Sequence, residues 1–164
     1  MKELKDKIKN NEIDSAINII ERIIEIENGN DISYLIDQLE STDNHLLRNA
    51  IAICLAKLRV EEAVDPLFKV LSNPKTQGFR GTLLASLESF DYSSHIDILV
   101  RFICEGNFEV SRKAFLLVEE VEQDIPNETK LKYISTIKSE IEKLVEKTNF
   151  LLEAIDIFTE DYDS

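Results

Sequence analysis

The sequence predicts an all-α fold, an α-solenoid of three helical hairpins with a helical cap at each end. One pattern of apolar residues and arginine recurs at an interval of 32 residues, in 31–61, 63–93 and 95–122. A repeat of this length is typical of solenoids, in which each unit buries its apolar face against its neighbours. The apolar positions follow helical spacing, and 4 Gly and 3 Pro are few for the tight turns of an all-β chain.

Length and composition predict one soluble domain. The chain has 164 residues, 43% hydrophobic and 31% charged, an ordinary composition for a folded protein with a sizeable core. No apolar run is long enough to span a membrane, and the N-terminal MKELKDKIKNNE lacks the apolar core of a signal peptide. We therefore expect a single cytoplasmic domain, with caps at 1–30 and 125–164 around the repeats at 31–124.

The charge is strongly negative, with 19 basic and 32 acidic residues and a formal net charge of −13. Acidic residues are spread along the whole chain, which favours solubility and leaves open attraction to a basic protein. Nucleic acid is disfavoured, because phosphate binding needs clustered Lys and Arg. Cys54 and Cys104 lie in apolar helical stretches, so we expect two reduced core residues and no disulfide.

The first 30 residues predict a short charged helix at Lys2–Lys9 and a longer helix at Asp14–Glu27. Asp14 is a favourable N-cap for the second helix, and the run Asn28–Gly29–Asn30 suits its end. The pair does not fit the repeat columns, so it is an N-terminal cap or a degenerate fourth unit. The apolar set of the longer helix is Ile17, Ile20, Ile23 and Ile24.

The first helix of each repeat has apolar residues at the i, i+3, i+4, i+7 spacing of one buried stripe. Pro66 falls in the first turn of its helix, where a missing N–H is tolerated. The three stripes are Ile32, Leu35, Ile36 and Leu39; Val64, Leu67, Phe68 and Leu71; and Ile96, Leu99, Val100 and Ile103.

Turn-rich stretches at Ser41–Asn44, Ser72–Gln77 and Glu105–Phe108 separate these helices from a second set. An arginine recurs near the start of each second helix, and we expect it to bond turn carbonyls or acidic groups of a neighbouring unit; the alternative is an anion-binding edge. The column consists of Arg48, Arg80 and Arg112. The inner faces are predicted as Leu47, Ala50, Ile51, Cys54, Leu55 and Leu58; Phe79, Leu83, Leu84, Leu87 and Phe90; and Val110, Ala114, Phe115, Leu117, Val118 and Val121.

A helical hairpin with a short polar turn, an arginine opening the second helix and a small residue two positions later resembles HEAT repeats. The similarity is to the short HEAT-like repeats of bacterial chromophore-lyase accessory proteins, and it covers about 31–124. It implies a right-handed solenoid whose second helices line the concave side. The chain has small residues at Ala50 and Ala114, and departs from the pattern at Thr82, Lys75 and Asn107.

On that resemblance, the residues of the second helices that lie outside the core columns form a concave surface. This surface mixes small apolar residues with carboxylates, and it could receive an amphipathic helix carrying Lys or Arg. Alternatively it is an ordinary surface, or the last helix covers it. The candidate partner-binding residues are Asn49, Ala52, Ile53, Ala56, Gly81, Ala85, Glu88, Lys113, Leu116 and Glu120.

After Pro126, Asn127 can cap a last helix that runs to about Thr159. Its apolar residues keep near-heptad spacing, either in one unbroken helix or with a break near Thr148–Asn149. The helix is expected to cap the open end of the solenoid; the alternative is a homodimer formed through it. The apolar positions are Leu131, Ile134, Ile141, Val145, Leu152 and Ile155.

The sequence predicts no catalytic residues, cofactor or metal. His45 and His95 have no second ligand at metal-binding spacing. Among HEAT-like enzymes, deoxyhypusine hydroxylases hold iron with His-Glu pairs, whereas here Leu46 and Ile96 follow the histidines. A second enzyme branch, which removes alkylated DNA bases, uses aromatic residues and a cationic cleft, a poor match for an acidic chain without Trp.

The leading functional hypothesis is a non-catalytic adaptor that binds a protein or peptide, possibly a basic one, on its concave helices. An acidic inhibitor or immunity-type protein that neutralises a basic enzyme is the first alternative. The second is a subunit of an enzyme related to the chromophore lyases, which would require a compact polar constellation in the groove.

Overall fold

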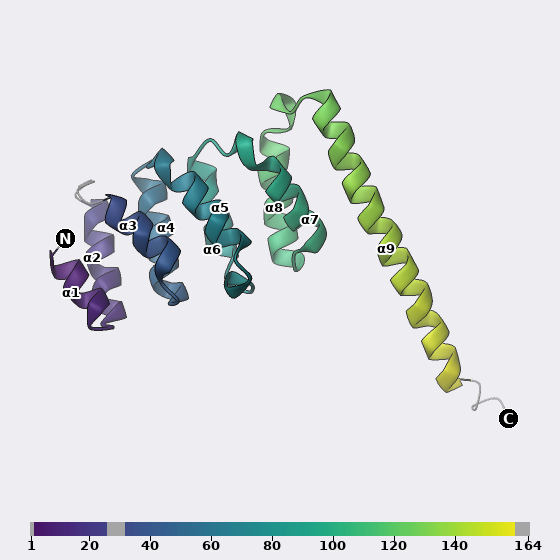
Figure 1. Ribbon diagram of the computed structural model, residues 1–164, viewed down its shortest axis with the longest axis horizontal. Helices are drawn as coiled ribbons and strands as arrows, with labels where there is room; N and C mark the ends of the chain where they lie inside the picture. Colours follow the sequence, from purple (N-terminus) through teal and green to yellow (C-terminus); the bar gives the residue numbers. More distant parts are fainter. Residues whose placement is uncertain (1, 26–31, 160–164) are drawn as a thin grey trace. The chain divides into compact units, whose positions relative to one another are not determined.

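Helices make up nearly all the regular structure of the computed structural model, which describes residues 2–25 and 32–159 (Figure 1). Within these ranges there are nine α-helices, several short 3₁₀ turns and no strand, so the all-α prediction is confirmed. The chain divides into two compact units, Met1–Glu120 with α1 to α8 and Val121–Ser164 with α9. We describe each unit separately.

The first two helices of the N-terminal unit pack on each other. The short one, α1 (Lys2–Lys9), has the predicted bounds, and α2 (Ile13–Glu25) begins one residue before the expected cap. Asp14 is therefore a first-turn residue and not the N-cap, a position where its charge still favours the helix dipole. The residues expected to end α2, 28–30, lie outside the described part of the chain.

Six further helices form three pairs in chain order, and the members of each pair contact each other. In addition, α2, α4, α6 and α8 contact one another in succession, as do α3 and α5 (Figure 1). The second helices of the pairs thus form one layer, on which the groove described below lies. The pairs are α3 (Ile32–Ser41) with α4 (His45–Lys57), α5 (Val64–Ser72) with α6 (Gly81–Ser86), and α7 (Ile96–Glu105) with α8 (Phe108–Glu120).

An asparagine in each inter-helix turn caps backbone N–H groups that would otherwise lack a partner. Asn44 Oδ1 accepts hydrogen bonds from the amides of Leu46 and Leu47, both at 3.0 Å. The Asn107 amide oxygen accepts from Val110 N at 2.9 Å, and that of Asn73 from Lys75 N at 3.0 Å. Such caps stabilise helices by roughly 1 kcal/mol. Asn44 and Asn107 cap the starts of α4 and α8, whereas Asn73 caps the 3₁₀ turn at Pro74–Thr76.

Most residues of the predicted core stripes are buried in the first helices and in α4, but α8 is displaced. Five of the predicted residues are only half-buried: Ile32, Ile36, Ala50, Leu58 and Ile103. In α8 the buried residues are Val110, Ala114 and Leu117, and Phe115 is 51% exposed. The turn before α4 has three residues (42–44), whereas that before α8 has two (106–107), so α8 starts one residue early. The expectation that Phe115 is a core residue is wrong for this reason.

Phe79 is also outside the core, with 45% of its surface exposed. It precedes α6, which is only six residues long and continues into a 3₁₀ turn at Leu87–Ser89. The ring stacks on His45, with centroids 4.2 Å apart. Phe79 therefore covers the start of α4 instead of filling the interior.

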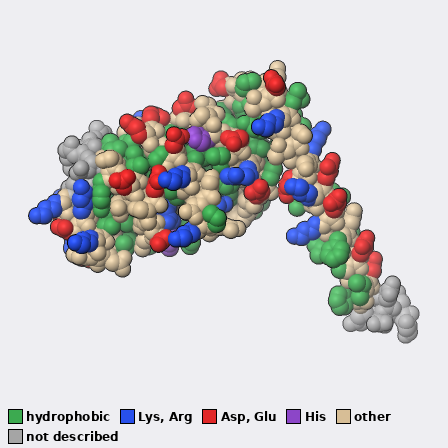
Figure 2. Space-filling model, viewed as in Figure 1, with side chains coloured by type: hydrophobic (Ala, Val, Ile, Leu, Met, Phe, Trp, Pro, Cys, Tyr) green, Lys and Arg blue, Asp and Glu red, His purple; other side chains and the backbone are tan. Residues whose placement is uncertain are grey.

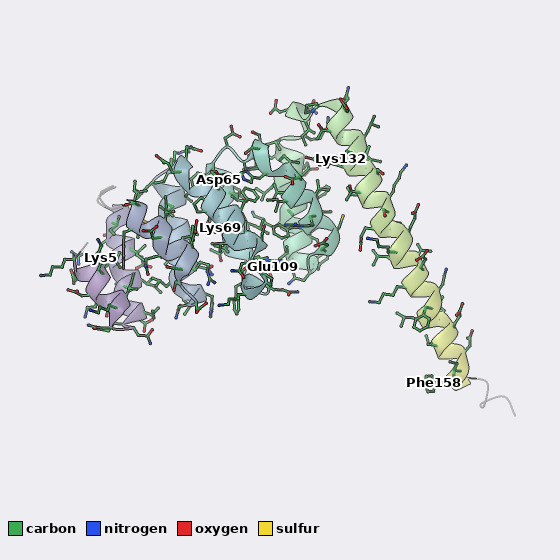
Figure 3. The ribbon with its side chains drawn as sticks, in the orientation of Figure 1. Lys5, Asp65, Lys69, Glu109, Lys132 and Phe158 are labelled. Carbon is green, nitrogen blue, oxygen red and sulfur yellow. The ribbon has the colours of Figure 1, made fainter. Side chains whose placement is uncertain are left out.

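One contact between α3 and α5 recurs between α5 and α7, with both of its residues 32 positions later in the sequence. Lys69 Nζ forms an ion pair with Glu40, and the Arg101 guanidinium donates to Ser72 Oγ at 3.4 Å. Figure 3 labels Lys69 on α5, together with Asp65. Such exposed contacts contribute about 0–1 kcal/mol each, so they orient the helices more than they stabilise them.

In the C-terminal unit a 3₁₀ turn at Glu122–Asp124 precedes α9 (Asn127–Thr159). The helix is unbroken: Thr148 Oγ1 donates to Leu144 O at 2.8 Å, which satisfies the hydroxyl within the helix. Asn127 is not the predicted cap, because it is already helical and the Pro126 carbonyl accepts Lys130 N at 2.9 Å. Among the described residues, no helix has the length and apolar character needed to cross a membrane.

Candidate binding groove

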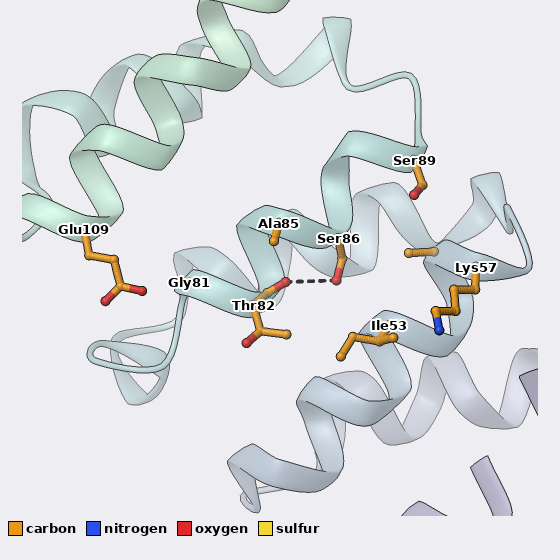
Figure 4. Close-up of a pocket in the computed structure, with 9 residues that line it drawn as sticks. Ile53, Lys57, Gly81, Thr82, Ala85, Ser86, Ser89 and Glu109 are labelled. Carbon is orange, nitrogen blue, oxygen red and sulfur yellow. Dashed lines mark hydrogen bonds between the residues drawn. The ribbon is translucent and has the colours of Figure 1, made fainter. Parts of the chain in front are cut away.

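Two adjoining pockets lie on the layer of second helices in the N-terminal unit, with volumes of about 420 Å³ and 440 Å³. They share Gly81 and Glu109, and we call them together the α4–α6–α8 groove; Figure 4 shows the first of the two pockets. The first pocket is lined by Ile53, Ala56, Lys57, Gly81, Thr82, Ala85, Ser86, Ser89 and Glu109. The second is lined by Gly81, Phe108, Glu109, Arg112, Lys113 and Leu116.

Gly81 allows the Glu109 side chain to lie against the start of α6. A Cβ on Gly81 would be 2.6 Å from Glu109 Oε1, closer than side-chain atoms normally approach. Figure 4 shows the carboxylate beside Gly81 and Thr82. The missing side chain permits this close approach, which places one negative charge where the two pockets meet.

Small side chains lie on the α4 and α6 faces of the first pocket, and larger apolar ones are exposed beside them. Ser86 is buried, and its hydroxyl donates to Thr82 O at 2.9 Å within α6, so it is already bonded (Figure 4). Ile53, Leu116 and Phe108 are 39%, 43% and 82% exposed. Exposed apolar side chains around a concave surface are typical of sites that bind a protein or peptide.

The groove carries more positive than negative charge, although the chain as a whole is acidic. Its lining includes Lys57, Arg112, Lys113 and Glu109. Lys113 forms an ion pair with Glu88, whereas no ion pair within the described residues engages Lys57 or Arg112. Elsewhere acidic and basic side chains are interspersed on the face drawn in Figure 2, without one large acidic patch.

Six of the ten predicted partner-binding residues line the groove: Ile53, Ala56, Gly81, Ala85, Lys113 and Leu116. The prediction is wrong for Ala52, which is fully buried. The reason is that α2, α3 and α6 all contact α4, so α4 buries more of its circumference than one stripe. Asn49 is half-buried outside the lining, and its Oδ1 is a buried oxygen without a hydrogen-bond partner in the described structure.

Glu88 and Glu120 do not provide the unpaired carboxylates expected for a basic partner. Both lie outside the lining of the two pockets, and Glu88 is neutralised by Lys113. Glu120 Oε2 lies 3.2 Å from the hydroxyl of Tyr92. Because Glu88 is paired and neither carboxylate lines the pockets, attraction of a basic helix into the groove loses its main basis.

Tyr92, which sequence reasoning did not single out, is buried in the turn before α7, and its hydroxyl contacts α8. Its hydroxyl lies 3.0 Å from Leu117 O and can donate to this carbonyl or to Glu120. Burial, followed by the charge of Glu120, raises the pKa of the Tyr92 hydroxyl, which keeps it neutral. A lone tyrosine outside the repeat columns gave no signal from which this contact could be predicted.

The arginine column separates into three environments. Arg48 is 6% exposed and donates to Thr42 O, and burial lowers its pKa while Asp43 opposes that change. Arg80 donates to Asn73 O at 3.3 Å. The expected bonding to turn carbonyls is present for these two, but Arg112 is exposed and lines the groove.

Ser111 takes the place of arginine in the third turn. Its hydroxyl lies 3.2 Å from Phe102 O and 3.1 Å from Gly106 O, the carbonyls that close this turn. This follows from the one-residue displacement of α8, which moves Arg112 outward and Ser111 inward. The three arginines therefore do not form a single anion-binding edge.

The histidines join neighbouring helices and lie outside the groove lining. His95 stacks on Phe68 with ring centroids 4.2 Å apart, and its Nε2 lies 3.1 Å from Asp65 Oδ1. Its other ring nitrogen is 2.9 Å from Ser94 Oγ. No group of three or more His, Cys, Asp or Glu side chains suited to hold a metal occurs in the described residues.

The two cysteines form no disulfide, as predicted, but differ in burial: Cys54 is fully buried and Cys104 half-buried. Burial raises the pKa of the Cys54 thiol to about 11, so below that pH it stays protonated and unreactive. We expect iodoacetamide at pH 8 to alkylate Cys104 in the native chain at least 100-fold faster than Cys54. Peptide mass spectrometry would measure both, and equal rates in urea would serve as the control. Equal rates in the native chain would contradict the burial of Cys54.

Comparisons with protein-family models, with curated proteins and with solved structures find no match to this chain.

Proposed function

We propose that residues 31–124 form a right-handed solenoid of three short HEAT-like repeats, and that the chain is a non-catalytic adaptor binding a protein or peptide in the α4–α6–α8 groove. The solenoid is supported by the succession of contacts α2–α4–α6–α8. It is further supported by the contacts of Lys69 with Glu40 and of Arg101 with Ser72, which recur with the period of the sequence. Stacked repeats characteristically bind partners on such continuous helical surfaces.

The observation that carries the binding role is the groove, with its small residues, exposed apolar side chains and unpaired cations. An amphipathic helix fits such a surface, because its apolar ridge can fill the pockets while flanking charges meet the rim. Lys57 and Arg112 favour carboxylates on that helix. We therefore propose an acidic amphipathic segment, in place of the basic partner that the net charge alone would favour.

The residues of the groove favour a non-catalytic binding role. The lining residues include no His or Cys, and the Ser86 hydroxyl is bonded within its own helix. A nucleophile would need a base within hydrogen-bond reach, typically about 2.6–3.2 Å. Accordingly, we assign no catalytic residue to the groove.

Selection of displayed 20-residue peptides on the full chain tests this proposal. We expect amphipathic helical sequences with Asp or Glu beside the apolar stripe. Ala85→Arg fills the first pocket and Arg112→Glu reverses a charge in the second, and each should weaken binding of the selected peptides at least 10-fold by calorimetry. Both positions are exposed, so folding should be retained.

Asp97→Arg is the matched control, because it adds the same side chain on the exposed surface of α7, outside both pockets. It should leave peptide affinity within about 2-fold of the unmodified chain. If the selected peptides bind the Ala85→Arg and Arg112→Glu variants as tightly as they bind the unmodified chain, the groove is not the binding site. Selected peptides rich in Lys or Arg would refute the proposed charge of the partner.

A further inference from the structure

The helix α9 bears an apolar face that is exposed along most of its length. From Ile134 to Phe158 its large apolar side chains are mostly half or more exposed, with Ile141 at 54% and Leu151 at 52%. Figure 2 shows hydrophobic side chains gathered on the C-terminal part of this helix, and Figure 3 labels Phe158 there. A contiguous apolar face of this extent on one helix marks an interaction surface.

The spacing of these residues is that of a coiled coil. They alternate by three and four residues through four heptads, with a threonine at one core position. Leu131, Val145 and Leu152 lie directly beside the stripe at e positions and widen it. The core a and d positions are Ile134, Ile137, Ile141, Leu144, Thr148, Leu151, Ile155 and Phe158.

The charges at the flanking g positions favour a second copy of α9 as the partner and an antiparallel direction for the two helices. The charged g residues are Glu140 and Lys147, of opposite sign and one heptad apart. When two copies of α9 pair antiparallel, g positions face g positions, so Glu140 of each copy meets Lys147 of the other. In a parallel pair Glu140 would instead face Val145, so no charged g residue would meet an opposite charge on the other helix. Within its own helix Glu140 pairs with Lys143 at 3.0 Å.

We propose that α9 forms an antiparallel two-stranded coiled coil with α9 of a second copy of this chain. In the register that the charges fix, Ile141 faces Leu144 of the second copy and Ile134 faces its Leu151. The 33-residue helices then overlap almost end to end, over about 48 Å, with Asn127 opposite Phe158. This use of α9 is independent of the groove.

The antiparallel direction also suits the charge of the rest of the chain. Residues 1–120 contain 14 Lys and Arg against 21 Asp and Glu, a formal charge of −7. They join α9 through its N-terminal end. In the antiparallel pair these two ends are separated by about the length of the helix, well beyond the roughly 8–10 Å over which salt screens exposed charges.

Sedimentation equilibrium of the full chain, with reductant, tests the pairing. We expect a dimer of twice 18.8 kDa that dissociates on dilution. Ile141→Asp should raise the dissociation constant more than 100-fold. Glu140→Lys and Lys147→Glu should each raise it about 10-fold, and the double exchange should restore it, because both facing pairs regain opposite charges.

Glu146→Lys is the matched control: it makes the same charge change at an f position, on the side of α9 away from the stripe, and should alter the dissociation constant less than 2-fold. A monomer at every concentration, as when α9 docks within its own chain, would overturn the proposal. A trimer or tetramer, or a dimer indifferent to Ile141→Asp, would do the same. A dimer lost with Ile141→Asp but unaffected by the single charge exchanges would overturn the antiparallel register.

Discussion

Replacing Arg48 with alanine should lower the free energy of unfolding by about 2–3 kcal/mol, whereas Arg112→Ala should change it by less than about 0.5 kcal/mol. Arg48 is buried and donates a charge-assisted hydrogen bond to Thr42 O, so alanine leaves a space and removes the donor of a turn carbonyl. Arg112 is exposed and lines the groove. Urea unfolding followed by circular dichroism would measure both differences.

Two further variants separate the causes. Arg48→Met keeps most of the buried stem and should recover part of the loss, because only the hydrogen bond and charge are removed. Ser111→Ala should lower the free energy of unfolding by about 1 kcal/mol, since Ser111 bonds the third turn where arginine bonds the first two. Equal losses for Arg48→Ala and Arg112→Ala would contradict the displaced register of α8.

The arginine column shows where repeat reasoning succeeds and where it fails. The period of 32 residues locates the three helix pairs from α3 to α8, because the buried stripe of a helix is fixed by spacing that the sequence displays. It cannot detect that the third turn is one residue shorter, since a polar turn carries no apolar signal. One residue rotates a helix by about 100°, enough to exchange Arg112 with Ser111 and to move Phe115 out of the core.

Six of the ten residues predicted for the concave face line the groove, whereas its charge could not be predicted from the sequence. These six residues lie on α4, α6 and α8. The three helices are neighbours in one layer, so their outward positions face the same side. The contacts of Glu88 with Lys113 and of Glu120 with Tyr92 join segments that lie far apart in the sequence. Net composition therefore favoured a basic partner, whereas the groove keeps Lys57 and Arg112 unpaired within the described structure.

Ala52→Asp should unfold much of the N-terminal unit, lowering its free energy of unfolding by roughly 4 kcal/mol or more. The Ala52 methyl group is fully buried on the helix that α2, α3 and α6 contact, where a carboxylate would lose its hydration. Ala85→Asp makes the same change at an exposed lining residue of the groove and should cost less than about 1 kcal/mol.

Thermal and urea unfolding would measure the stability of both variants. The sequence predicts both alanines, Ala52 and Ala85, on the same concave face. The pH dependence supplies an internal check: a buried aspartate has a raised pKa, so stability lost at pH 7 should be partly recovered as the pH falls toward 5. Ala85→Asp should show no such recovery, because its carboxylate stays solvated. If Ala52→Asp were as stable as Ala85→Asp, α4 would present Ala52 to solvent, and both the packing of α4 between α2 and α6 and the boundary of the groove would have to be redrawn.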